Sequence, residues 1–186
     1  MSEKIILKNV RLSYEHIFRP SAIADDAQKK YSATAIIPKS EKAQLTAVKA
    51  ALLAAAESKF PGKIKPGAAW PSSLHCPLKD GDELADEHPE YAGAYILRAS
   101  SERRPVVLDR RRAPVTEEDG IIYSGCYVNL SLAAAPFDVS AKKGVIVYLN
   151  GVQFVKDGDR LAGHDATGDF EDLDGDAELN EDDLPF

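Results

Sequence analysis

The chain has 186 residues, 44% of them hydrophobic, enough for the core of one ordinary domain with a short appendage. No apolar run approaches the roughly 18–20 residues that cross a bilayer, and no apolar signal region follows Met1, which argues against a membrane or exported protein. The net charge of −7 conceals two parts of opposite sign. All 23 basic residues lie in residues 1–163 with 20 of the 30 acidic ones, so this body carries +3 and residues 164–186 carry −10.

The first third of the chain predicts two strands and a helix. Residues 1–14 alternate apolar and polar side chains, as strands do, whereas residues 15–30 are polar and predict a loop. Residues 31–37 predict a second strand. Residues 41–58 predict the one clear helix, with Ser40 as its N-cap. Its apolar face is expected to consist of Leu45, Val48, Leu52 and Ala55.

Residues 61–91 are rich in Pro, Gly and charge and predict ordered loops. Further strands are expected at residues 94–99, 105–108, 125–132 and 144–155. In the third of these, Cys126 and every second residue after it should face the core, with Tyr127 on the other face. Five or six strands and one helix fit a small closed barrel, and fit almost as well an open α+β sheet with the helix on one face.

Basic residues alternate with aromatic ones in the predicted loops and on the non-core faces of the predicted strands. Unpaired bases stack on aromatic rings for roughly 1–3 kcal/mol each, and Lys and Arg contact phosphates. Taken singly, each of these aromatic residues is more often a core residue; together with the cations they predict a groove for single-stranded nucleic acid. The expected contacts are Lys30, Tyr31, Trp70, Arg98, Arg103, Arg104, Arg110, Arg111, Arg112 and Tyr127, followed by Tyr14, Phe18, Lys142 and Lys143.

Residues 164–186 combine ten acidic side chains with few apolar ones, so we expect this tail to be disordered. Its last five residues are Asp182, Asp183, Leu184, Pro185 and Phe186. A terminal Phe with a free carboxylate is suited to bind an apolar pocket with a basic rim on a partner protein. A tethered polyanion would also compete with nucleic acid for the basic groove.

The acidic ending is similar to the tip of bacterial single-stranded DNA-binding proteins. The body resembles, in order along the chain, segments of a family of bacteriophage single-stranded DNA-binding proteins. These segments are Pro77-Leu78-Lys79-Asp80-Gly81-Asp82, Glu90-Tyr91-Ala92-Gly93, Ala99-Ser100, Arg104-Pro105-Val106-Val107-Leu108-Asp109 and Tyr123-Ser124-Gly125-Cys126-Tyr127-Val128. The resemblance implies an OB-fold barrel with extra loops that binds DNA without sequence preference during phage replication, recombination or repair.

The residues and the resemblance together predict a mainly β protein of two parts. Residues 1–163 are expected to form an OB-fold-like barrel with one main α-helix and long loops, which binds single-stranded DNA. Residues 164–186 are expected to be a disordered acidic tail that recruits replication proteins such as a DNA polymerase or helicase. No cofactor, metal or enzymatic turnover is expected, a homo-oligomer is left open, and the expected location is the cytoplasm, that of the host cell for a phage protein.

Two alternatives stay open. In a protein-interaction or DNA-mimic module, the acidic tail would be the active part and the body would have no affinity for DNA. A metal-dependent nuclease would use the acids between Asp80 and Glu87, although these crowd one loop, and a solvated turn built on Gly81 explains them better.

Overall fold

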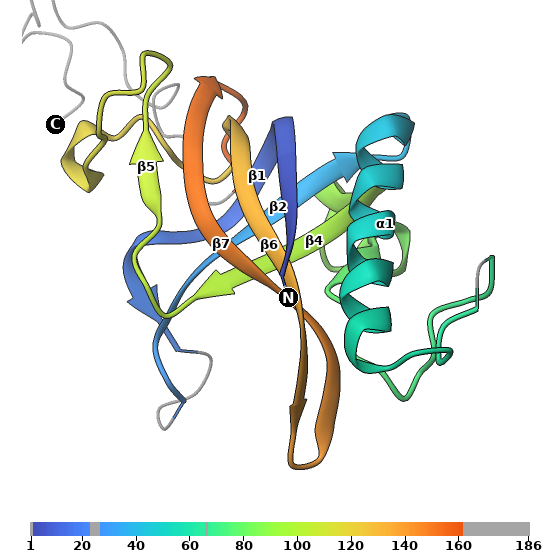
Figure 1. The fold of residues 1–186 in the computed structure, drawn as a ribbon. Coiled ribbons are helices and arrows are strands. Elements are labelled where there is room, and N and C mark those ends of the chain that lie inside the picture. Colours follow the sequence, from blue (N-terminus) through green and yellow to red (C-terminus); the bar gives the residue numbers. More distant parts are fainter. Residues whose placement is uncertain (1, 23–26, 66, 162–186) are drawn as a thin grey trace, which may run out of the picture.

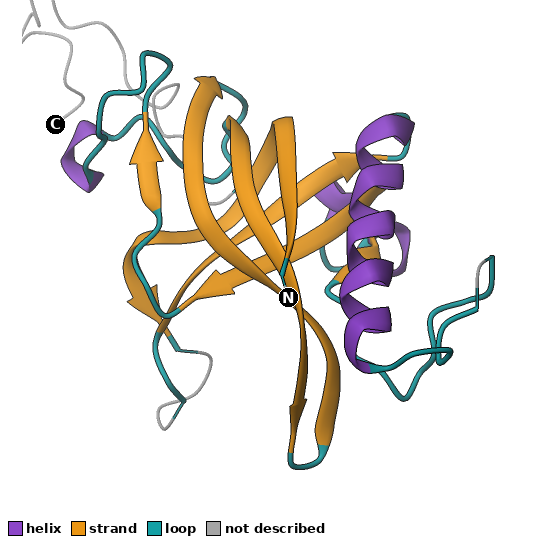
Figure 2. Cartoon of the chain, in the orientation of Figure 1, coloured by secondary structure: helices purple, strands orange, loops and turns teal. Residues whose placement is uncertain are grey.

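The computed structural model describes residues 2–22, 27–65 and 67–161. These residues form seven strands and one α-helix, with three short 3-10 turns (Figure 2). The strands are β1 (Glu3–Ser21), β2 (Lys30–Pro38), β3 (Leu78–Asp80), β4 (Ala94–Ser101), β5 (Val106–Leu108), β6 (Tyr127–Val139) and β7 (Lys142–Lys156), and the helix is α1 (Lys42–Lys59). The predicted acidic tail lies outside the described residues.

Five of the strands close into a barrel. β1 pairs with β2 and β6, β2 pairs with β4, and β6 pairs with β7, all antiparallel. β4 and β7 then meet in parallel at Ser100 and Tyr148, which completes the circle β1-β2-β4-β7-β6 (Figure 1). A closed five-stranded barrel of this kind is the architecture of the OB fold, so the predicted barrel is confirmed and the open sheet is wrong.

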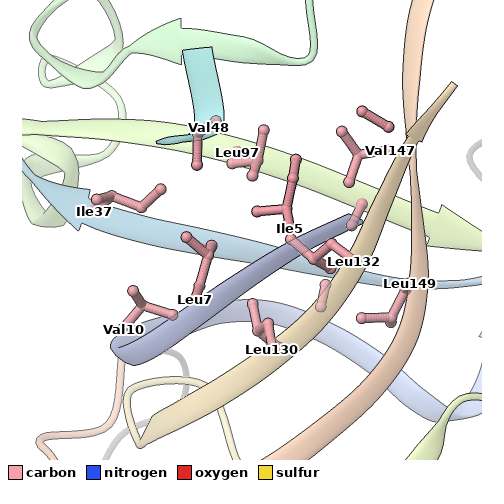
Figure 3. Packing of buried hydrophobic residues seen from close by; sticks show 14 of the residues in the cluster. Ile5, Leu7, Val10, Ile37, Val48, Leu97, Leu130, Leu132, Val147 and Leu149 are labelled. Atoms are coloured by element: carbon pink, nitrogen blue, oxygen red, sulfur yellow. The ribbon is translucent and has the colours of Figure 1, made fainter. Parts of the chain in front are cut away.

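The barrel interior is filled by alternate residues of each strand. In β6, Val128, Leu130 and Leu132 are almost fully buried while the residues between them are partly exposed, as predicted, and Cys126 just before the strand is buried as well. Figure 3 shows these leucines packed against Leu7 of β1 and Leu149 of β7. Because each fully buried Leu or Val contributes roughly 1.5–3 kcal/mol, this packing is the main source of the barrel's stability.

Helix α1 covers part of the barrel core. Its predicted apolar face, including Val48 and Leu52, belongs to the same buried cluster as the barrel interior. The predicted Ser40 cap is wrong, because Glu41 occupies the N-cap and makes no side-chain cap hydrogen bond. The first turn is instead tied to β1, where the Gln44 side chain bonds both the N–H and the C=O of Lys8, at 2.8 and 3.0 Å. No helix among the described residues is long and apolar enough to cross a membrane.

Two predicted loops contain strand. Residues 15–21, read as loop, continue β1, and its pairing with β2 is broken by register shifts on either side of His16. These irregularities interrupt the alternation of apolar residues that would have predicted a strand. Residues 61–91, also read as loops, contain β3, which is three residues long and pairs with one end of β4.

The second edge of β7 is occupied by three short segments in turn. His75 bridges to Gly144, Ser100 of β4 pairs with Tyr148, and β5 pairs with residues 151–153, all in parallel. Because each segment is short, none of them would form this edge alone, but together they cover it along most of its length. We call this junction between β7 and the three segments the seam.

Gly144 lets His75 approach β7. Its φ of +151° is rare for other residues, and a Cβ there would overlap the backbone N and O of His75. We expect Gly144→Ala to lower the free energy of unfolding by about 2–5 kcal/mol, measured by urea denaturation of the full chain. Gly62 also has a positive φ, +71°, but an added Cβ would meet nothing within 4 Å, so Gly62→Ala should cost about 1 kcal/mol. Equal losses in the two variants would contradict the close approach.

Candidate nucleic-acid interface

Cations and aromatic rings gather on the outward side of the seam. β7 presents Lys142 and Tyr148 outward, because Val145, Val147 and Leu149 between and beside them point into the core. On β4, Arg98 is exposed between the buried Leu97 and Ala99.

Three further side chains complete this surface. Lys79 of β3 is exposed beside β4, His75 is exposed next to Gly144, and Phe137 of β6 is the cross-strand partner of Gly144. The His75 and Phe137 rings meet edge to face, with centroids 6.0 Å apart. We call the set Phe137, Lys142, Tyr148, His75, Lys79 and Arg98 the seam surface.

The arginines predicted to contact DNA follow one another along the same seam, in the order in which they occur in the chain. Arg98 belongs to β4 just before its contact with β7. Arg103 and Arg104 are exposed in the connection that leaves β4 at Ser101 and enters β5 beside Gly151 of β7. Because β4, this connection and β5 run parallel to β7, the chain distributes its arginines along one strand.

The last three predicted arginines, residues 110–112, occupy an exposed turn after β5. The carboxylate of Asp109 accepts hydrogen bonds from the N–H groups of Arg111 and Ala113, both at 2.8 Å, which fixes the turn. Its carbonyl accepts one from the Gln153 side chain of β7 at 3.3 Å, and Gln153 in turn bonds Asn129 of β6 at 3.1 Å. This chain of amides attaches the arginine turn to the barrel.

Beside the arginine turn, the outer faces of β1, β6, β7 and β5 form a groove of about 450 Å³. Its lining includes the exposed apolar side chains of Ile6 and Val106, with Lys8 and Arg112 as its cations. The groove continues the seam surface beyond Tyr148. From Lys142 to Gln153, at roughly 3.3 Å per residue, β7 would span about 36 Å, so the seam surface and the groove are distributed along this length of β7.

Most of the aromatic side chains predicted to contact DNA are in contact with other residues of the protein. Trp70 and Phe18 pack against the core cluster, and the Trp70 N–H is bonded to the Leu74 carbonyl at 2.9 Å. Tyr127 lies on the non-core face as predicted, but the Lys156 ammonium lies 4.6 Å from its ring centre. Tyr31 is partly buried in β2, next to Lys30, whose ammonium is 4.0 Å from Glu102. The Tyr14 side chain lies outside the described residues.

Four members of the seam surface were not among the predicted contacts: His75, Lys79, Phe137 and Tyr148. The alternation in β7 was a usable signal for Tyr148, which is 43% exposed. The position of His75 depends on its bridge to Gly144, 69 residues later in the chain, which no local pattern reveals. Lys143, which was predicted, is exposed near the turn of the β6–β7 hairpin.

Two of the acids considered for a nuclease form ion pairs. Asp80 and Asp82 both bind the Lys39 ammonium, at 2.8 and 2.6 Å. Hydrogen bonding from Lys39 lowers the pKa of Asp80, and the Gly93 N–H, followed by Lys39, lowers that of Asp82. These contacts join β2 to the turn after β3. Within the described part of the chain, no three His, Cys, Asp or Glu side chains are grouped to hold a metal ion.

The last described residues are fastened across the outside of the barrel. Arg11 of β1 donates to the Asp159 carbonyl at 2.7 Å, and the Arg160 guanidinium lies 4.5 Å from the Tyr123 ring centre. Leu161 packs on a small cluster that includes Ile36 of β2 and Ile96 of β4. Ile96 and Arg98 lie on the same outer face of β4, so Leu161, the last described residue, packs on the face of β4 that carries Arg98.

Two comparisons with known sequences both match this chain to phage proteins. Residues 3–184 match the family model of the Enterobacter phage Enc34 ssDNA-binding protein. Over 176 residues the chain is 37% identical to a protein named p50 of Acyrthosiphon pisum secondary endosymbiont phage 1, covering 91% of this chain and 94% of that protein.

Solved structures of phage single-stranded DNA-binding proteins resemble the fold of this chain. The bacteriophage Enc34 single-stranded DNA-binding protein, in complex with ssDNA, superposes with a TM-score of 0.75 at 27% identity, covering 86% of this chain and 90% of that one. Bacteriophage T7 gp2.5, another single-stranded DNA-binding protein, gives a TM-score of 0.56 at 14% identity over 95% of this chain and 99% of that one. At 14% identity, the similarity to T7 gp2.5 is a similarity of fold alone.

Proposed function

The chain belongs to the family of the Enterobacter phage Enc34 ssDNA-binding protein, and from this premise we propose that it binds single-stranded DNA along the seam. The observation that carries the proposal is the seam surface, where the exposed ring of Tyr148, the partly exposed ring of Phe137 and four basic or titratable cationic groups share one outward face of the barrel. Rings that stack on bases beside cations that meet phosphates bind unpaired strands without needing a particular sequence.

We further propose that the strand follows β7 from the β6–β7 hairpin toward the groove beside Arg112. The hairpin corresponds to the loop between the last two barrel strands, which OB folds commonly use for oligonucleotides. A track of about 36 Å is compatible with the roughly 4–16 nucleotides that one OB fold covers. Arg103, Arg104 and the arginine turn, which the sequence predicted as DNA contacts, then meet the DNA backbone in succession.

The separate roles of residues 1–163 and residues 164–186 are part of the same proposal. The body binds DNA, and the acidic tail binds other proteins and competes with DNA for the body. The packing of Leu161 against Ile96 supports competition, because ten acids tethered a few residues after Leu161 would be at high local concentration near Arg98 and Lys79. The phage origin of the relatives supports a role in replication, recombination or repair of phage DNA inside the host cell.

Arg98→Gln should weaken binding to labelled oligo-dT and reduce the slope of log affinity against log salt by about 0.7, the value for one lost phosphate contact on a single strand. The matched control is Lys42→Gln in the first turn of α1, which removes the same charge from another part of the barrel and should leave the slope unchanged. Fluorescence anisotropy at several salt concentrations measures both. Identical slopes for the two variants would exclude Arg98 from the interface.

Deleting residues 164–186 should raise DNA affinity on the order of tenfold at low salt and much less at high salt, because screening weakens the competing polyanion. Deleting only Leu184, Pro185 and Phe186 serves as the control, since all ten acids remain. Competition would be refuted by a tailless protein whose affinity equals that of the full chain at every salt concentration. A tailless protein with no DNA affinity at all would favour the protein-interaction or DNA-mimic alternative.

Phe186→Ala should leave DNA affinity unchanged and weaken binding of the full chain to a purified replication protein, a DNA polymerase or helicase, by about tenfold or more. The physical reason is the loss of the ring from a peptide whose other residues are mainly acidic. Leu179→Ala, inside the tail, is the control and should change neither affinity. Surface plasmon resonance measures the partner affinity, and equal values for the two variants would remove the docking role of Phe186.

A further inference from the structure

We propose that His75 is a phosphate-binding residue of the seam surface and that it takes up a proton when it binds the DNA backbone. The inference rests on the proposed function and deepens it, because it assigns one residue a charge that changes on binding. It does not follow from the sequence, where His75 stands in a loop next to Cys76 without any nucleic-acid motif.

The backbone of His75 is held firmly at the seam. Its N–H donates to the Lys143 carbonyl at 2.8 Å, and its carbonyl accepts from the Val145 N–H at 3.0 Å. The preceding residue, Leu74, is buried, and its carbonyl accepts the Trp70 indole N–H. The ring is thus positioned by main-chain bonds and by core packing, and its own polar atoms are not needed to hold it.

The imidazole nitrogens are available to a ligand. His75 is exposed, and among the described residues its ring has no hydrogen-bond or ion-pair partner. The ring lies edge to face with Phe137, and the two ring centroids are 6.0 Å apart. A nucleotide whose phosphate binds the imidazole would therefore have Phe137 within reach of its base, the usual combination at a single-strand site.

The charges around His75 are positive on the elements that adjoin it. β3 contributes Lys79, β7 contributes Lys142 and Lys143, and β4 contributes Arg98, whose N–H bonds the Pro77 carbonyl at 3.2 Å. β6 contributes Asp138, the cross-strand partner of Lys143. Desolvation first, and then repulsion from Lys79 and Lys142, hold the pKa of His75 below its ordinary value. The free protein accordingly keeps this imidazole neutral near pH 7.

A backbone phosphate reverses this balance. Its negative charge offsets the two lysines and favours the imidazolium, so the pKa of His75 is higher in the complex than in the free protein. A group whose pKa rises on binding strengthens the complex below that raised pKa and loses this contribution as the pH increases through it. Affinity for single-stranded DNA therefore increases as the pH falls, by about tenfold for each unit of pKa difference.

The test is a titration of labelled oligo-dT, whose bases do not change charge in this range, with the full chain between pH 5.5 and 8 at constant salt. The wild-type affinity should rise as the pH falls. His75→Gln should keep most of the affinity at pH 8 and lose most of the rise. His16→Gln and His88→Gln, which replace histidines outside the seam surface, should keep the wild-type profile. The same series without residues 164–186 removes His164 from consideration.

The outcomes separate this inference from the proposed function. Binding that is strong but independent of pH, or a pH profile that is the same in wild type and His75→Gln, would overturn the role of His75 and leave DNA binding intact. An equal loss of the rise in His16→Gln would assign the proton to another group and overturn it as well. No binding at any pH in low salt would overturn the proposed function and the inference together.

Discussion

The closure of the barrel along the second edge of β7 is the constraint on which the rest of the structure depends. An uncovered strand edge of this length would expose a row of unpaired N–H and C=O groups. The chain covers it with three short parallel contacts at Gly144, Tyr148 and residues 151–153. Each contact comes from a segment that carries cations, so the same pairing that closes the fold also builds the charged side of the seam.

This arrangement is what allows, in the proposed function, a protein of net charge −7 to bind a polyanion. The seam surface combines Arg98, Lys79 and Lys142 with the rings of Phe137 and Tyr148, while the carboxylates of Asp80 and Asp82 are taken up by Lys39. The last described residues contact the same side of the barrel: Asp159 accepts a hydrogen bond from Arg11 of β1, and Leu161 packs on the outer face of β2 and β4. The proposed DNA-binding surface and the last described residues therefore both involve β4.

Local patterns predicted most of the elements and part of the site. The helix, its buried face and the strands with regular alternation follow from spacing alone, since each reflects one side of a repeat facing the core. The end of β1 and the whole of β3 were missed because bulges and short pairing erase that alternation. The arginines could be predicted as a group, but His75 and Phe137 could not, since they meet only through a long-range bridge. Trp70 packs against the core while remaining partly exposed, so its predicted contact with DNA stays a prediction.

The most direct measurement of the central claim is photo-crosslinking of the full chain to oligo-dT carrying a photoreactive 5-iodouracil, with the attached residues identified by mass spectrometry. Attachment at Tyr148, Phe137 and His75, lost in excess unlabelled oligo-dT, is the result we expect, because these are the rings of the seam surface. Attachment confined to residues of α1 or to aromatic rings away from β7, such as Phe18, would place the strand elsewhere and contradict the seam as the DNA-binding surface.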